Sequence, residues 1–158
     1  MSRYEVHACT DVTGFSLLGH LSEMLGMKRR TSGSSDAESG IGFSAVSTGQ
    51  SVSRLLGAVI HTSAVPHFKR VREFVEEDFF ITANGQRNRN HLGDLVEFQS
   101  TAFWQQELLF DPQTSGGLLA AVPNEIADEV LTEIKKLGLP CSLIGEVTDQ
   151  LDHILVTA

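Results

Sequence analysis

The residues best suited to chemistry lie near the start of the chain, in the run Thr10-Asp11-Val12-Thr13-Gly14-Phe15. A carboxylate and two hydroxyls stand just before a predicted helix, whose free N–H groups attract anions such as phosphate. Gly14 lets a ligand approach the backbone closely, and Asp11 offers the carboxylate oxygen that Mg²⁺ prefers. The alternative is that Asp11 or Thr13 only caps the helix, and from spacing alone this is the commoner role.

Two further stretches have the composition of phosphate-binding turns. In Asp111-Pro112-Gln113-Thr114-Ser115-Gly116-Gly117, adjacent glycines after two hydroxyls can form a tight turn whose N–H groups face an anion, or a plain turn before a buried strand. In Asn84-Gly85-Gln86-Arg87-Asn88, Arg87 can pair with a phosphate through two hydrogen bonds. On spacing alone, a plain turn and a solvated loop remain the simpler interpretations.

Two other patterns are set aside. Residues 40–45, Gly-Ile-Gly-Phe-Ser-Ala, have the glycine spacing of a dinucleotide-binding turn, but no predicted strand precedes them. Cys9 lies two residues before Asp11, yet no His/Asn or His/Asp pair is evident to activate it. We therefore predict that Cys9 is a small buried thiol.

The composition narrows the functional classes. The chain has 158 residues and a net charge of −8, which fits one globular domain and argues against a nucleic-acid partner. Two cysteines and six scattered histidines suggest neither a disulfide framework nor a zinc site. No apolar run approaches the ~20 residues of a membrane span, and the first residues lack a signal-peptide core. We expect a cytoplasmic protein with no membrane partner.

The elements that must position these residues are predicted from hydrophobic periodicity. Phe15, Leu18, Leu21 and Leu25 recur on one face of a helix that follows Gly14. Residues 28–40 are small, polar and aperiodic, which is typical of a mobile loop. We further expect three helices: one at 66–78, one at 101–109 with Phe103 and Trp104 in the core, and one at 124–137 with Asn124 as its cap and Gly138 as its end. Strands are expected at 57–62, 117–122, 141–147 and 153–157, with a candidate strand at 41–46. Residues 82–90 are expected to form a loop.

These elements predict a mixed α/β fold. The strand, helix and strand at 117–147 are expected to form a right-handed crossover on one sheet. We treat residues 1–158 as one domain.

The first two motifs together resemble one family. Residues 7–24 resemble the start of the C-terminal domain of selenophosphate synthetases (selenide, water dikinases), and residues 111–122 resemble the second signature of that domain. They occur in the family's order, about a hundred residues apart, which is far more specific than either short turn. The resemblance runs from about residue 5 to the C-terminus, and residues 28–56, which fit poorly, are expected to be an insertion.

This resemblance implies membership of the aminoimidazole ribonucleotide synthetase superfamily and a layered, partly ferredoxin-like fold. It implies an enzyme that makes selenophosphate, AMP and orthophosphate from selenide, ATP and water, with Mg²⁺ ions on the phosphates. The family's Mg²⁺-binding aspartate falls on Asp11. The same cleft wall would include Thr10, Thr13, Gly14, Thr114, Ser115, Gly116 and Gly117, together with Arg87 and Asn88.

The chain departs from the family pattern in two respects. Ser16 stands where the family usually has glycine. Nothing in the chain resembles the family's N-terminal half, which carries the reactive Cys or selenocysteine and the other Mg²⁺ ligands. We therefore expect a C-terminal piece that is inactive alone and has the N-terminal domain as its partner. The full-length enzyme is expected to be a homodimer, and the piece itself a monomer.

The sequence leaves two alternatives open. One is a related ATP-dependent synthetase of the same superfamily that acts on another substrate. The other is a non-catalytic interaction domain, in which Asp11 only caps a helix and the polar 28–40 segment meets a protein partner. An Asp11→Asn change separates an enzyme from an interaction domain. If Asp11 only caps a helix, the change affects stability alone, whereas in an enzyme it affects activity as well.

Overall fold

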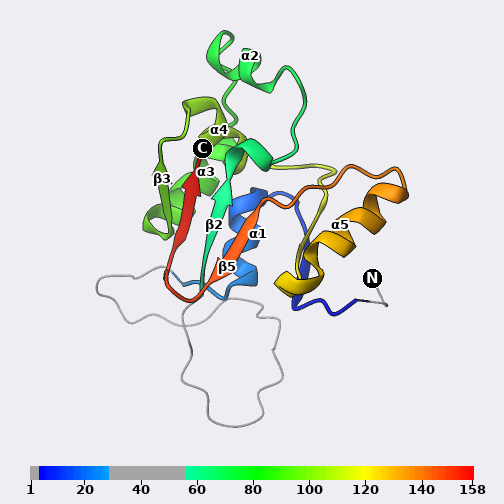
Figure 1. Ribbon diagram of the computed structural model, residues 1–158. Helices are drawn as coiled ribbons and strands as arrows, with labels where there is room; N and C mark the ends of the chain where they lie inside the picture. Colours follow the sequence, from blue (N-terminus) through cyan, green and yellow to red (C-terminus); the bar gives the residue numbers. More distant parts are fainter. Residues whose placement is uncertain (1–3, 29–55) are drawn as a thin grey trace.

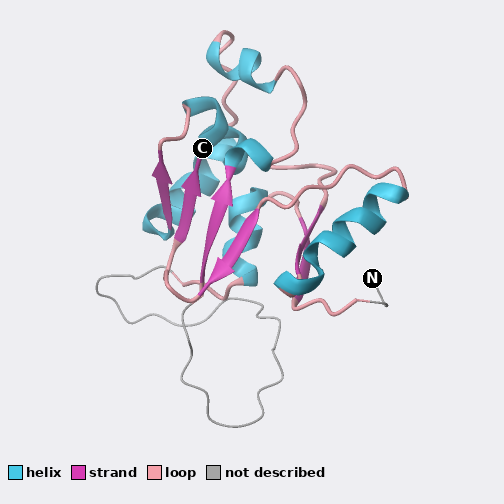
Figure 2. Cartoon of the chain, in the orientation of Figure 1, coloured by secondary structure: helices cyan, strands magenta, loops and turns pink. Residues whose placement is uncertain are grey.

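The computed structural model describes residues 4–28 and 56–158, and helices and strands are interspersed along them (Figures 1 and 2). The predicted mixed α/β class is confirmed. Short 3₁₀ turns cover Thr62–Ala64, Gly93–Leu95 and Asn124–Ile126. The strands are β1 (Ala8–Asp11), β2 (Gly57–His61), β3 (Val96–Gln99), β4 (Leu118–Ala121), β5 (Gly145–Thr148) and β6 (Ile154–Thr157); the helices are α1 (Ser16–Met24), α2 (Val71–Glu76), α3 (Ala83–Leu92), α4 (Phe103–Phe110) and α5 (Ala127–Lys136).

The described strands form two separate sheets. In the larger sheet the order is β3-β6-β2-β5, where β6 runs parallel to both β2 and β3, and β5 runs antiparallel to β2. In the smaller sheet β1 pairs antiparallel with β4. The predicted crossover is therefore wrong, because β4 and β5, which flank α5, belong to different sheets.

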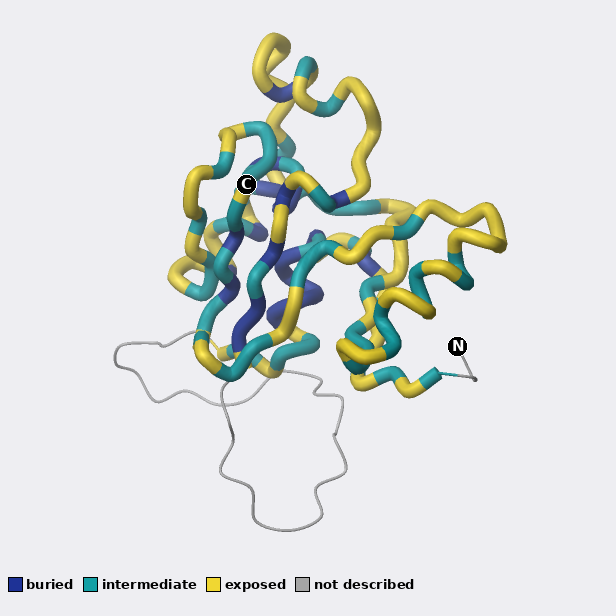
Figure 3. The backbone as a smooth tube through the Cα atoms, in the orientation of Figure 1, coloured by how far each residue is buried: buried dark blue, intermediate teal, exposed yellow. Residues whose placement is uncertain are grey.

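The core lies between the larger sheet and the helices α1, α3 and α4. Apolar side chains of β2 and β6, such as Ile60 and Val156, pack against Leu18 of α1, Leu92 of α3 and Phe110 of α4. Each of these residues is less than 4% exposed. Figure 3 shows this burial as dark segments gathered on the sheet and α1, whereas α5 carries none.

The region predicted as a loop over 82–90 is instead the helix α3. Its sequence is polar, so hydrophobic periodicity gives little signal. The helix is fixed by other means: the Thr82 hydroxyl caps its first turn by accepting the Gly85 N–H at 3.0 Å. The Arg89 guanidinium, over the Phe110 ring, also pairs with the buried Glu107 carboxylate on α4 at 2.6 Å.

Helix α2 is shorter than predicted. It begins at Val71, five residues after Pro66, and ends at Glu76. Its sides carry exposed ion pairs, Arg70 with Glu73 and Arg72 with Glu76. The hydrogen-bonded Arg70 guanidinium lowers the pKa of the Glu73 carboxyl.

Several predicted core residues are on the surface. Phe15 is 51% exposed and Phe103 49%, and Leu118 in the strand predicted to be buried is 69% exposed. Cys9, predicted as a buried thiol, is also exposed. The predicted strand at 41–46 and the loop at 28–40 lie outside the described residues, apart from Lys28. Over the described part of the chain, no helix is both long and apolar enough to cross a bilayer.

Candidate functional site

The two motifs at 10–15 and 111–117 lie side by side, although about a hundred residues separate them. The Val12 N–H donates to the Gly117 carbonyl at 2.9 Å, and the Gln113 N–H donates to the Thr13 carbonyl at 3.0 Å. Gly116 packs so closely that a Cβ there would collide with the Val12 carbonyl oxygen. The tight turn therefore serves first to join the two motifs.

The pairing of β1 with β4 explains why the motifs meet. In this antiparallel register Asp11 lies opposite Leu118, so the first motif leaves the small sheet where the second enters it. The strands bring the two polar loops to the same end of the sheet, and the backbone hydrogen bonds then fix their spacing.

Helix α3 is fastened to both motifs. The Asn88 side-chain amide, only 7% exposed, donates to the carbonyls of Gly14 and Phe110, both at 3.0 Å. The Thr82 hydroxyl donates to Asp111 at 3.0 Å, so the second motif also holds the start of α3. A buried amide that satisfies two carbonyls from separate segments fixes their relative positions, because leaving either unpaired is costly.

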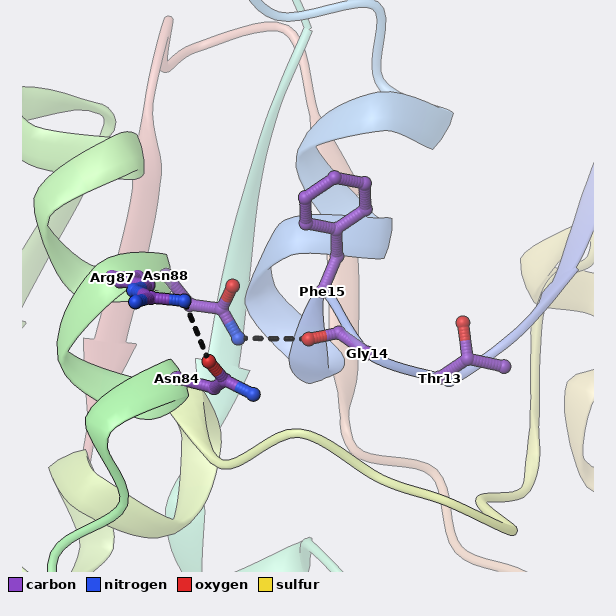
Figure 4. Close-up of a pocket in the computed structure, with 6 residues that line it drawn as sticks. All are labelled: Thr13, Gly14, Phe15, Asn84, Arg87 and Asn88. Atoms are coloured by element: carbon purple, nitrogen blue, oxygen red, sulfur yellow. Dashed lines mark hydrogen bonds between the residues drawn. The ribbon is translucent and has the colours of Figure 1, made fainter.

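Between α3 and the first motif lies an open pocket of about 440 Å³. In the view of Figure 4, Asn84 and Asn88 extend from α3 toward the 13–15 loop, and Thr13 lies on the far side of Gly14 from α3. The Arg87 guanidinium donates to the Asn84 side-chain oxygen at 3.3 Å, and it forms no ion pair within the described part of the chain. The lining residues are Thr13, Gly14, Phe15, Asn84, Arg87 and Asn88. An exposed guanidinium with five donors and no carboxylate partner suits an anionic ligand.

Asp11 lies outside this pocket, exposed at the end of β1. Neither Asp11 nor Thr13 caps α1 through its side chain, so that prediction is wrong. Within residues 4–28 and 56–158 the Asp11 carboxylate has no hydrogen-bond or ion-pair partner, and no group of three or more metal-ligating side chains occurs there. An exposed carboxylate fits a share in a Mg²⁺ site. The described residues do not complete such a site.

The structure therefore divides the predicted site residues into two sets. Thr13, Gly14, Arg87 and Asn88 line the pocket. Thr10, Asp11, Thr114, Ser115, Gly116 and Gly117 do not line it, although the backbone hydrogen bonds keep the two motifs adjacent.

The prediction missed Phe15 and Asn84 as pocket residues. Asn84, Arg87 and Asn88 are spaced three and four apart, which puts them on one face of a helix. This spacing could have indicated a shared pocket wall. Because residues 82–90 were predicted to form a loop, the spacing was not interpreted as a helix face.

Ser16, the first residue of α1, has an unusual backbone. Its φ of 69° lies in the left-handed region, which favours glycine. Its side chain is fully buried, and Oγ has no hydrogen-bond partner among the described residues. This is the position where the resembled family usually has glycine, so the departure has a physical consequence in this chain.

The fold and the site together define a class: a mixed α/β domain in which two joined motifs and a helix form an exposed wall suited to anions. The chain matches the family "AIR synthase related protein, C-terminal domain" over residues 39–157, and it belongs to this family. The match begins within the segment 28–56 that was predicted to be an insertion, and that insertion stays a prediction.

Similar proteins carry the name "Selenide, water dikinase". The chain is 41% identical over 150 residues to that of Agathobacter rectalis, covering 94% of this chain and 36% of the relative. It is 38% identical over 149 residues to that of Desulfitobacterium hafniense (strain DSM 10664 / DCB-2), covering 94% and 36%. It is 36% identical over 160 residues to that of Pelobacter propionicus, covering 99% of this chain and 38% of the relative. The chain thus spans little more than a third of each relative. The resemblance carried by the two motifs is confirmed.

Proposed function

We propose that this chain is the C-terminal part of an enzyme that makes selenophosphate, AMP and orthophosphate from selenide, ATP and water. The observation that carries the proposal is the joining of the 10–15 and 111–117 motifs into one wall by direct backbone hydrogen bonds. The names of the relatives, at 36–41% identity over nearly the whole chain, support the same reaction.

Within this proposal each part of the wall has a distinct task. Asp11 contributes one carboxylate to Mg²⁺, which neutralises phosphate charge when it is bound. Arg87 offers its donors to phosphate oxygens from the α3 side. Asn88 keeps the Gly14 backbone at a fixed distance from α3. The turn at 114–117 holds the first motif in place through Val12.

The proposed partner is the N-terminal domain of the same enzyme. Large apolar side chains are exposed around β4, α5 and the segment after α5, where Leu118, Leu137 and Leu139 are 69%, 74% and 56% exposed. Exposed apolar surface of this kind is typical of interfaces between domains or proteins. This domain would bring the further Mg²⁺ ligands and the reactive residue, and the full-length enzyme would be a homodimer. Two unpaired cysteines agree with a cytoplasmic enzyme.

A chimaera tests the proposal. This chain replaces the matching segment of the Agathobacter rectalis protein, and phosphorus NMR follows ATP, selenide and Mg²⁺ in the chimaera and in its parent. We expect the chimaera to make selenophosphate. Asp11→Asn should lower the rate by roughly 100-fold, the upper end of what even an indirect partner of a metal contributes.

Asp78→Asn, a change of another exposed aspartate, just after α2 and away from both the wall and the proposed partner surface, serves as the matched control and should leave the rate unchanged. Circular dichroism checks that both variants fold. A folded Asp11→Asn chimaera with normal turnover would remove Asp11 from the metal site. A folded chimaera that makes no selenophosphate beside an active parent would argue against the reaction.

A further inference from the structure

A chain of hydrogen bonds starts at the pocket residue Thr13 and leads into α1. The Thr13 hydroxyl Oγ1 lies 2.9 Å from His20 Nε2, and His20 Nδ1 lies 3.0 Å from Glu23 Oε2. His20 is buried at 9% exposure, and the Phe15 ring contacts its imidazole edge-on at 5.9 Å. His20 and Glu23 lie outside the set of residues that line the pocket. They reach the pocket through Thr13.

The geometry determines which way these hydrogen bonds run when the imidazole is neutral. An ionised carboxylate can only accept hydrogen bonds, so the hydrogen between His20 and Glu23 must be on Nδ1. A neutral imidazole with hydrogen on Nδ1 has an acceptor at Nε2. The Thr13 hydroxyl must then donate to Nε2. Its hydrogen points toward His20, and the hydroxyl oxygen keeps its lone pairs free to accept a hydrogen bond from another donor.

We propose that His20 and Glu23 are positioning residues that make the Thr13 hydroxyl a hydrogen-bond acceptor toward the pocket. The same logic operates wherever a hydroxyl, an imidazole and a carboxylate are bonded in series, because the carboxylate selects the imidazole tautomer. Here the arrangement selects a hydroxyl orientation. The assignment of a ligand rests on the proposed function, whereas the orientation rests on the hydrogen bonds alone.

This orientation distinguishes the two sides of the pocket. Arg87 presents only donors and therefore suits phosphate oxygens. Thr13 presents an acceptor, which repels a bare phosphate oxygen and suits a donor such as water on a divalent cation. A hydrated Mg²⁺–polyphosphate has both kinds of group, and divalent Mg²⁺ usually keeps several of its waters. Thr13 would thus contact the metal hydration shell while Arg87 contacts the phosphate.

Nitrogen-15 NMR of this chain tests the orientation directly, since two-bond correlations in the imidazole show which nitrogen is protonated. The His20 signals are assigned by their loss in His20→Gln. We expect Nδ1 to be protonated and Nε2 to be unprotonated. A His20 ring with hydrogen on Nε2, or on both nitrogens, at neutral pH would overturn the proposal.

Glu23→Ala should shift His20 toward the tautomer with hydrogen on Nε2. Glu133→Ala is the matched control, because Glu133 is also paired with a basic side chain three residues away, Lys136 on α5. The control should leave the His20 spectrum unchanged. If Glu23→Ala also leaves it unchanged, Glu23 does not set the tautomer and the proposal is wrong.

The active chimaera provides the second readout. Glu23→Ala should weaken the apparent affinity for Mg²⁺ at fixed ATP by about 10-fold, the lower end for an outer partner of a metal site. Thr13→Ser, which keeps the hydroxyl, should retain the affinity, whereas Thr13→Val should lose it. Unchanged Mg²⁺ dependence in Glu23→Ala would overturn the role of this pair. An inactive unmutated chimaera would count against the proposed function alone, because the tautomer is measured in this chain without turnover.

Discussion

The helices α3 and α5 show opposite relations between sequence and structure. Helix α5 has the clearer sequence signal, with an apolar stripe, acidic residues in its first turn and lysines in its last, yet none of its residues is buried. Helix α3 has a polar sequence without a clear stripe, yet it buries Gly85, Asn88 and Leu92. Periodicity therefore reports that a helix can form. It does not indicate how closely the helix packs against the rest of the domain.

The attachment of α3 comes from specific polar contacts. Asn88 bonds to two carbonyls, Thr82 caps the helix and bonds to Asp111, and Arg89 pairs with Glu107. Helix α5 has no side-chain cap at its start, and its apolar side chains are partly but not fully buried. The region beside the pocket is thus held by directional hydrogen bonds, whereas the region around α5 leaves apolar side chains exposed.

The largest expected effect concerns Asn88. Asn88→Ala leaves the Gly14 and Phe110 carbonyls without their buried donor, so we expect a loss of about 3 kcal/mol of stability. Asn84→Ala, at an exposed position one turn earlier on the same face of the helix, should cost less than about 0.5 kcal/mol. Urea unfolding of both variants gives the difference. Equal losses would show that α3 is held by its apolar contacts and not by Asn88.

The same contacts explain which parts of the fold the sequence predicts. The strands β2 and β6 and the helices α1 and α5 lie close to where apolar residues predict them, because this signal is local; of the strand predicted at 141–147, only the end belongs to β5. The pairing of β4 with β1 was not predictable, because the partner of a strand depends on contacts far along the chain. Helix α3 was missed for a related reason: its stabilising partners, Asp111, Gly14 and Phe110, are distant in sequence.

The candidate site was predicted in a similarly uneven way. The motif residues were found from their types and from the resemblance, and their adjacency in the structure agrees with a common wall. The hydrogen bond between Thr13 and His20 could not be predicted, because His20 is not among the candidate site residues that the sequence indicates. His20 lies seven residues after Thr13, and the distance of 2.9 Å between their side chains is evident only in the structure.

The second prediction compares the starts of the two helices. Thr82→Ala removes both the cap of α3 and the hydrogen bond to Asp111, so we expect a loss of about 2 kcal/mol. Asn124 precedes α5 without a side-chain hydrogen bond to the helix, so Asn124→Ala should change stability by less than about 0.5 kcal/mol. Thermal unfolding measures both. A larger loss for Asn124→Ala than for Thr82→Ala would reverse the comparison, because it would make α5 the helix that depends on its start.

The smallest effects concern two residues with left-handed backbones, one in each region. Ser16→Gly should relieve the strain of a φ of 69° and remove a buried hydroxyl that lacks a partner among the described residues. Glycine's greater freedom in the unfolded chain offsets part of this gain, so we expect a net stabilisation of about 1 kcal/mol. Gly138, just past α5, has a φ of 74° and open space where a Cβ would lie. Gly138→Ala should therefore cost about 1 kcal/mol through backbone strain alone. Unfolding of both variants in urea measures these opposite signs. A destabilised Ser16→Gly would mean that the serine side chain packs usefully in the core near α1, and that its backbone strain is smaller than its φ indicates.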